Sequence, residues 1–175
     1  HEGPGHAAQF VLGHLVWRVD LVVKIQGRTH QGHHRRARAQ EIAAVDHIPG
    51  SELAKTVVLN ADGQLIMAVL PADHIIDMEV MKSRIGCRKL SLASASEFAE
   101  RFAPCRPGAM PPFGRLFGVT VFCDRALAEK REIEFNAGTH IDTIRMPFSE
   151  FAQLETPIFT DFSEKATGKR RLSAA

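Results

Sequence analysis

The chain has 175 residues, of which 45% are apolar and 24% charged, and its formal net charge at pH 7 is +2. A single globular domain with its own hydrophobic core has this size and composition. The composition excludes a collagen, a coiled coil and a disulfide scaffold, and no apolar run approaches the roughly 18 residues that a membrane-spanning helix needs.

The charges are unevenly distributed along the chain. Residues 1–40 carry six Lys/Arg against two Asp/Glu, residues 41–163 carry twelve against seventeen, and residues 164–175 carry four against one. An acidic centre argues against a protein that coats duplex nucleic acid, but it is compatible with contact to nucleic acid at one local point. Basic chain ends are most often simply solvated. We therefore divide the chain into an atypical N-terminal segment (1–37), one domain (38–163) and a basic C-terminal tail (164–175).

The first forty residues differ in pattern from the rest of the chain, which becomes regular from Arg38. Residues 28–36 are basic, interrupted by glycine and without apolar periodicity, which indicates a loop. Partial alternation and β-branched content suggest a strand over residues 15–23. A short helix is predicted over residues 40–45, because Pro49-Gly50 follows it.

A predicted hairpin and helix follow Pro49-Gly50. The turn Asn60-Ala61-Asp62-Gly63 joins two apolar runs, residues 55–59 and 65–70, which predicts a β-hairpin. Asp73 is a candidate N-cap for a helix that Gly86 ends. The apolar residues at helical spacing within that helix are Met78, Met81 and Ile85.

From residue 94 onward, capping residues and apolar runs alternate in the same way. Ser94 and Glu97 form a capping-box pattern ahead of Phe98 and Phe102, which predicts a helix. The remaining predicted elements are strands over 119–123, 132–135 and 143–146, a helical turn over 125–130 and a last helix that Ser149 opens. This alternation predicts an α/β or α+β domain with a mixed sheet.

The three cysteines, Cys87, Cys105 and Cys123, contain no Cys-x-x-Cys pair, and the chain opens without signal-peptide character. An odd number of cysteines in this context favours a reducing, cytoplasmic location, with buried apolar thiols as their expected use. The nucleophile-elbow, Walker and zinc-protease patterns are missing as well. We expect no metal and no cofactor.

Two loops contain residue types that bind or activate substrates. Residues 106–114 hold three prolines and two glycines, so their backbone N–H groups could hold an oxyanion, although a rigid connector has the same composition. Asn136, Thr139 and His140 directly follow a predicted strand, where functional side chains often lie. Lys55 enters an apolar strand, where its ammonium could either meet an anion or be solvated.

Four stretches in this order resemble the YbaK/ProX family, the editing domain associated with prolyl-tRNA synthetase. They are residues 53–59 (LAKTVVL), 67–73 (MAVLPAD), 108–114 (GAMPPFG) and 136–140 (NAGTH). The resemblance covers about residues 38–162 and implies a compact α/β (α+β) domain with a mixed, barrel-like sheet and flanking helices. It also implies hydrolysis of the ester in mischarged aminoacyl-tRNA, mostly tRNA(Pro).

The resemblance also implies roles for individual residues. Lys55 corresponds to the family lysine that contacts the terminal phosphate of the tRNA, and Thr56 follows it as in many members. Gly108 and Pro112 match the Gly-x-x-x-Pro loop, which packs near the ester through its backbone. Gly138 and His140 match the Gly-Thr-His turn of the alanine-editing branch, whose loop helps to hold the aminoacyl group. We therefore expect catalytic roles for Lys55, Gly108, Pro112 and His140, and substrate binding by Thr56, Asn136, Gly138 and Thr139. The alanine-editing branch has Asn where this chain has Thr56, so the amino acid removed stays open.

The expected function is trans-editing of tRNA(Pro) that carries a small wrong amino acid such as Ala or Cys. The expected partners are the acceptor end of aminoacyl-tRNA and prolyl-tRNA synthetase, without a membrane, for a monomer or weak homodimer. Two other functions remain open: a non-catalytic tRNA-binding or regulatory module of the same fold, and a hydrolase of small activated esters. An aminoacyl ester is already activated, so a placed water and an oxyanion donor suffice without a covalent nucleophile.

Overall fold

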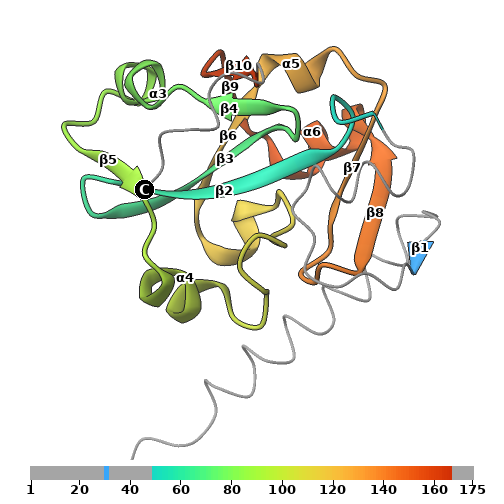
Figure 1. The fold of residues 1–175 in the computed structure, drawn as a ribbon, viewed down its shortest axis with the longest axis horizontal. Helices are drawn as coiled ribbons and strands as arrows, with labels where there is room; N and C mark the ends of the chain where they lie inside the picture. The colour runs from blue at the N-terminus through green and yellow to red at the C-terminus, as the bar shows by residue number, and fades with distance from the viewer. Residues whose placement is uncertain (1–29, 32–48, 167–175) are drawn as a thin grey trace, which may run out of the picture.

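The β-hairpin predicted around residues 60–63 is the centre of the fold. The computed structural model of the protein, drawn in Figure 1, describes residues 30–31 and 49–166. Strands β2 (Ala54–Ala61) and β3 (Gln64–Pro71) pair antiparallel along their whole length, from Ala54 opposite Pro71 to Ala61 opposite Gln64. Asp62 and Gly63 both have positive φ, 50° and 91°, as a tight two-residue hairpin turn requires.

The hairpin belongs to a mixed five-stranded sheet with the order β5-β2-β3-β6-β9. Strand β5 (Leu90–Leu92) pairs antiparallel with β2, whereas β6 (Thr120–Asp124) is parallel to β3, and β9 (Ile158–Thr160) is parallel to β6. The predicted mixed sheet is therefore confirmed. The barrel-like closure is wrong for the described residues, because β5 and β9 remain edge strands of an open sheet.

Two smaller sheets complete the fold. Strand β8 (Asp142–Pro147) lies between β1 (His30–Gln31) and β7 (Glu132–Asn136), antiparallel to both. Strand β4 (His74–Ile76) pairs antiparallel with β10 (Ser163–Lys165). An isolated parallel bridge between Leu53 and Glu134 joins the entry of β2 to β7.

Two predicted helix starts need correction. Helix α3 (Met78–Ile85) is capped by Asp77, whose carboxylate accepts from the N–H groups of Glu79 and Val80. The predicted cap, Asp73, precedes it by four residues, because residues 74–76 extend to form β4. Helix α6 (Phe148–Glu155) begins directly after Pro147 without a side-chain cap, so Ser149 does not open it.

Two other predicted helices are confirmed, and one short helix was not predicted. Helix α4 (Ala95–Phe102) has the predicted capping box of Ser94 and Glu97, and α5 (Arg125–Ala128) is the predicted helical turn. A 3-10 helix, η1 (Gly114–Phe117), begins at the end of residues 106–114, which we call the Pro/Gly loop. No helix among the described residues is long and apolar enough to cross a membrane. The strand predicted over 15–23 and the helix predicted over 40–45 lie outside the described residues.

The five-stranded sheet has a hydrophobic cluster on each face. One cluster contains Met81 of α3, and the other contains residues of α4, α6, β7 and β8; in Figure 1, α4 lies below the sheet. Along β2, Val58 packs into the second cluster and Leu59 into the first. Because side chains alternate along a strand, Thr56 lies on the face of Val58 and Lys55 on the face of Leu59.

Candidate active site

The Pro/Gly loop and residues 137–141, the two loops singled out in the sequence, lie against each other. We call them the loop pair. The backbone N–H of Arg106 donates to the carbonyl of Gly138 over 3.0 Å, and the N–H of Gly138 donates to the carbonyl of Ala109 over 2.9 Å. Residues 106–114 connect α4 to η1, and residues 137–141 connect β7 to β8. Both hydrogen-bonding groups of the Gly138 peptide are therefore used to hold the loops together.

Glycine is required at the two positions where the loops meet. Gly108 has φ +80° and Gly138 has φ +93°, a region that L side chains rarely adopt. A Cβ on Gly138 would lie 3.3 Å from Sγ of Cys105, and a Cβ on Gly108 would lie 3.4 Å from Cε1 of His140. The loops therefore approach closely because these residues have no side chain.

The imidazole of His140 is held by the Pro/Gly loop. Its Nε2 lies 3.0 Å from the carbonyl oxygen of Pro107. A carbonyl oxygen only accepts, so this contact assigns the proton to Nε2 and leaves Nδ1 as an acceptor in the neutral ring. Nδ1 is buried and has no hydrogen-bond partner among the described residues. An acceptor in this state is suited to hold a water molecule or a substrate N–H group.

Thr139 has a structural part in the turn. Its hydroxyl donates to Oδ2 of Asp142 over 2.5 Å and accepts from the backbone N–H of Asp142 over 3.1 Å. The N–H of Ala137 donates to the carbonyl of Asp142 over 2.9 Å, which closes the loop. These bonds fix the direction in which the loop presents His140.

Asn136 and Thr56 have unused polar atoms. The Asn136 side chain is buried, and its Oδ1 has no partner among the described residues; the same is true of Oγ1 of Thr56. Four buried side-chain polar atoms lack a partner in the described part of the chain, and His140, Asn136 and Thr56 supply three of them. The fourth belongs to Ser163. Unpaired buried polar atoms are rare in folded proteins, so their concentration in predicted site residues indicates a binding function.

The Lys55 side chain contacts backbone carbonyls between β3 and β4 and not the loop pair. Its ammonium donates to the carbonyl of Ala72 over 3.3 Å and to the carbonyl of His74 at the β3–β4 corner. Burial lowers the pKa of Lys55, and the nearby charge of Asp73 partly opposes this. Asp73 also accepts from Nδ1 of His74 over 2.9 Å and lies 3.9 Å from Nζ of Lys165.

The predicted site residues thus fall into two groups within the described structure. Gly108, Gly138, Thr139 and His140 meet at the loop pair, while Lys55 belongs to the β3–β4 corner. The bridge between Leu53 and Glu134 brings the entry of β2 beside β7, the strand that ends at Asn136. Pro112 is buried within the Pro/Gly loop. No group of metal-binding side chains occurs in the part of the chain that the structure describes.

Glu155 is a buried acidic residue that the sequence analysis missed. Its carboxylate oxygens lie 3.2 and 3.4 Å from the backbone N–H of Arg115, at the start of η1, and Arg115 also donates to the Leu154 carbonyl over 3.1 Å. Burial raises the pKa of Glu155 to about 7, against the hydrogen bonds and charge of this segment. Glu155 therefore fastens the segment that directly follows the Pro/Gly loop. No sequence signal identified it, because its partner η1 was not predicted.

The fold is that of an aminoacyl-tRNA editing domain. The family described as "Aminoacyl-tRNA editing domain" matches residues 33–154, and the chain belongs to this family. The chain is 32% identical over 131 residues to the multifunctional Ser/Thr-tRNA deacylase ProXp-y of Escherichia coli K12, an alignment that covers 70% of this chain and 78% of that protein. It is 31% identical over 80 residues to proline–tRNA ligase of Geobacter metallireducens, which covers 46% of this chain and 14% of the ligase.

Solved structures share the fold. The hypothetical protein APE2540 superposes with a TM-score of 0.72 at 22% identity, covering 84% of this chain and 99% of that one. A protein proposed as a trans-editing enzyme for prolyl tRNA synthetase gives a TM-score of 0.72 at 19% identity, covering 94% and 99%. The predicted family, the α+β fold and the enzyme class, an aminoacyl-tRNA deacylase, are confirmed.

Proposed function

We propose that this protein hydrolyses the ester bond of tRNA that carries a small wrong amino acid. The first candidate substrates are Ala and Cys on tRNA(Pro), as the motifs imply. Ser and Thr are the second, because the relative ProXp-y is named for them and is 32% identical to this chain. The observation that carries the proposal is the loop pair, which holds His140 with an unpaired, buried Nδ1.

His140 and Asn136 would act on water or substrate without becoming covalently attached. The ester carbon is already electrophilic, so a water held by Nδ1 of His140 can attack it while the ring accepts the proton. The amide of Asn136 has an unpaired acceptor that can orient the water or the amino group of the substrate. The electron pair of the broken C–O bond leaves with the ribose oxygen, which takes up a proton.

The Pro/Gly loop has few N–H groups available to hold the oxyanion. Pro107, Pro111 and Pro112 have none, and the N–H of Ala109 donates to the carbonyl of Arg106 over 3.0 Å. Gly108 and Met110 have backbone N–H groups without a partner among the described residues, so we assign the oxyanion to one of these two donors.

Lys55 would bind the terminal phosphate of the tRNA. An ammonium has three N–H donors, and two are directed at the carbonyls of Ala72 and His74. The third is free for a phosphate oxygen, and the two carbonyls fix the position of the charge. The bond to phosphate would favour the charged form of Lys55, which burial otherwise disfavours.

The test is release of amino acid from a panel of charged tRNAs. The panel contains Ala-, Cys-, Ser-, Thr- and Pro-tRNA(Pro), with wild type beside His140→Ala and Lys55→Ala. We expect selective release that falls at least ~100-fold in each variant. Lys165→Ala is the matched control for Lys55, since it removes a cation beside the same Asp73 and should leave release unchanged.

Other results would support the alternative functions. Binding of tRNA with no release from any member of the panel would indicate a non-catalytic module. Release from small activated esters but not from tRNA would indicate a general esterase. Full release by Lys55→Ala or His140→Ala would remove that residue from the site.

The remaining parts of the proposal concern the context of the enzyme. We propose that residues 38–163 form the catalytic domain, with residues 1–37 and 164–175 as flanking segments. We further propose that it acts in the cytoplasm as a monomer or weak homodimer, on tRNA that prolyl-tRNA synthetase has charged.

A further inference from the structure

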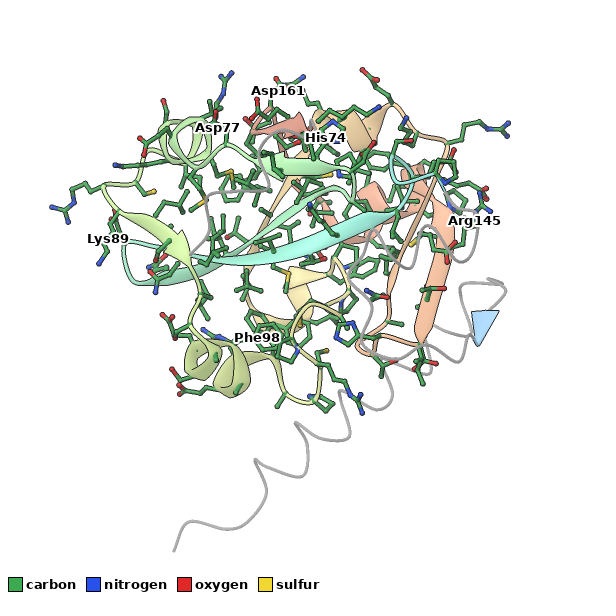
Figure 2. The ribbon with its side chains drawn as sticks, in the orientation of Figure 1. His74, Asp77, Lys89, Phe98, Arg145 and Asp161 are labelled. Atoms are coloured by element: carbon green, nitrogen blue, oxygen red, sulfur yellow. The ribbon has the colours of Figure 1, made fainter. Side chains whose placement is uncertain are left out.

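A basic patch around the connection from α3 to β5 takes no part in the site described above. It consists of Lys82 and Arg84 in the last turn of α3 and of Arg88 and Lys89 ahead of β5. The sequence from Val80 to Ser96 contains these four cations and no acidic residue, although residues 41–163 are acidic overall. In Figure 2, Lys89 points outward at the left edge of the molecule, and Arg145 lies at the opposite edge.

The backbone beneath the patch is held firmly in place. Asp62, in the hairpin turn, accepts from the N–H of Arg88 over 2.9 Å and from the N–H of Lys89 over 2.7 Å, and donates its own N–H to the Lys89 carbonyl over 3.0 Å. These bonds lower the pKa of Asp62, so its carboxylate stays charged and keeps both residues in position.

The cationic side chains form no close ion pair, although the carboxylate charge of Asp62 acts on Arg88 and Lys82. Arg84, Arg88 and Lys89 are exposed, and none of the four residues forms an ion pair within the described structure. By contrast, Arg145 contacts Glu52 and Glu132, and Arg125 contacts Asp161. The carboxylate of Glu97, beyond β5, is used by Ser94 and Asn60.

Helix stability explains only half of this arrangement. Cations in the last turn of a helix interact favourably with its dipole, which accounts for Lys82 and Arg84. Arg88 and Lys89 lie beyond Gly86, the residue that ends the helix, and gain nothing from the dipole. Two adjacent exposed cations on a clamped backbone are suited to a polyanion, because they meet it in a fixed geometry.

We infer that the basic patch binds the phosphate backbone of the tRNA while the acceptor end occupies the loop pair. This inference rests on the proposed function for the identity of the polyanion. It adds a second contact surface, built from the hairpin turn and the α3–β5 connection. The patch would contribute to affinity for the tRNA body and leave the chemistry of the ester unchanged.

The test compares two double variants of the full chain in binding uncharged tRNA at 50 to 200 mM salt. Arg88→Ala/Lys89→Ala removes two cations of the patch. Lys130→Ala/Arg131→Ala is the matched control, since this adjacent pair lies between α5 and β7 and shows no ion pair in the described structure. Each phosphate contact adds about 0.9 to the slope of log affinity against log salt, so the patch variant should lose about 1.8 from that slope.

Over this fourfold change in salt, wild type should lose about 12-fold more affinity than the patch variant. The control should retain the wild-type slope. A wild-type slope in the patch variant, or an equal loss in the control, would overturn the inference. A third outcome would also overturn it: wild type binds anionic phospholipid vesicles, Arg88→Ala/Lys89→Ala does not, and both bind tRNA equally. That outcome would assign the patch to a membrane surface.

Turnover separates this inference from the proposed function. The patch variant should raise KM for full-length charged tRNA about 10-fold with unchanged kcat, and it should hydrolyse a short aminoacylated 3′ fragment like wild type. If no variant releases amino acid, the proposed function fails, and the salt slope with uncharged tRNA still decides whether the patch binds RNA. An unchanged KM for the full-length substrate would count against the patch alone.

Discussion

Replacing Glu155 with glutamine should remove a pH dependence of stability that the fold creates. The wild-type carboxyl is buried at the end of α6 and accepts from the start of η1, and its pKa is raised from 4.5 to about 7. Glutamine has nearly the same shape and can still accept from the N–H of Arg115, but it cannot ionise. The substitution therefore separates the effect of the Glu155 charge on stability from the effect of its shape and hydrogen bond.

The sign follows from the direction of the pKa shift. Because the folded pKa lies above the unfolded one, the stability from neutral Glu155 is fully present below pH 4.5 and is lost as pH rises through 7. Between pH 5 and 8.5 wild type should lose about 2–3 kcal/mol of unfolding free energy relative to Glu155→Gln. The variant should thus be the more stable protein at pH 8.5.

Urea unfolding of both proteins across this pH range measures the difference. Glu150→Gln is the matched control, since Glu150 is an exposed residue in the first turn of the same helix. Its curve should run parallel to that of wild type. If the Glu155→Gln curve also runs parallel to wild type, then Glu155 is ionised in the fold without cost, and the reasoning from its burial is wrong.

Two further substitutions test the packing of the fold and of the loop pair. Asp124→Ala should cost about 2–4 kcal/mol in urea unfolding, because the buried carboxylate accepts from the N–H groups of Ala126, Phe162 and Ser163, and its removal leaves one buried and two partly buried donors unpaired; a loss below 0.5 kcal/mol would contradict this. Gly138→Ala should cost about 1–2 kcal/mol and lower amino acid release, because the position has φ +93° and the new Cβ meets Sγ of Cys105; unchanged release would show that the loop tolerates a side chain.

Elements with local signals could be predicted from the sequence. The β2–β3 hairpin follows from a turn of four residues, and α4 follows from Ser94 and Glu97, which satisfy each other within one helical turn. In each case the residues that determine the structure are neighbours in the chain. The wrong cap for α3 has the opposite cause, because Asp73 and Asp77 are equally good caps by residue type. Pairing of residues 74–76 with the distant strand β10 decides between them.

The same limit applies to the small strands and to the cysteines. Strands β4, β9 and β10 have three residues each and form only because remote segments pair with them. Of the three thiols predicted to be buried, that of Cys123 is buried, whereas Cys87 and Cys105 are partly exposed. Residue type alone cannot report this difference, since it depends on what packs above each residue.

For the candidate site, the two loops could be predicted from the sequence, but the contacts that fix the positions of the loops and of Lys55 could not. Gly108, Gly138 and His140 stand out because glycine and histidine in loops carry specific chemistry, and the structure brings these three together. Sequence could not show that Lys55 is directed by the carbonyls of Ala72 and His74, or that Glu155 fastens the segment after the Pro/Gly loop. Both are contacts across the fold between residues whose individual patterns are ordinary.

These contacts suggest how the protein separates recognition from chemistry. The prolines fix φ in one loop, and the hydrogen bonds of Gly138 and His140 hold the two loops together, so in the proposed reaction His140 would meet an ester without rearrangement. A rigid site of this kind gains little discrimination from fit alone, since one methylene changes binding by only about 1–3 kcal/mol. The proposed contacts to the tRNA at Lys55 and at the basic patch cannot distinguish amino acids either. They would lower KM for every charged tRNA alike, so any selectivity must be located at the loop pair, where Nδ1 of His140 is buried and unused, and at the adjoining end of β7, where the same holds for Oδ1 of Asn136.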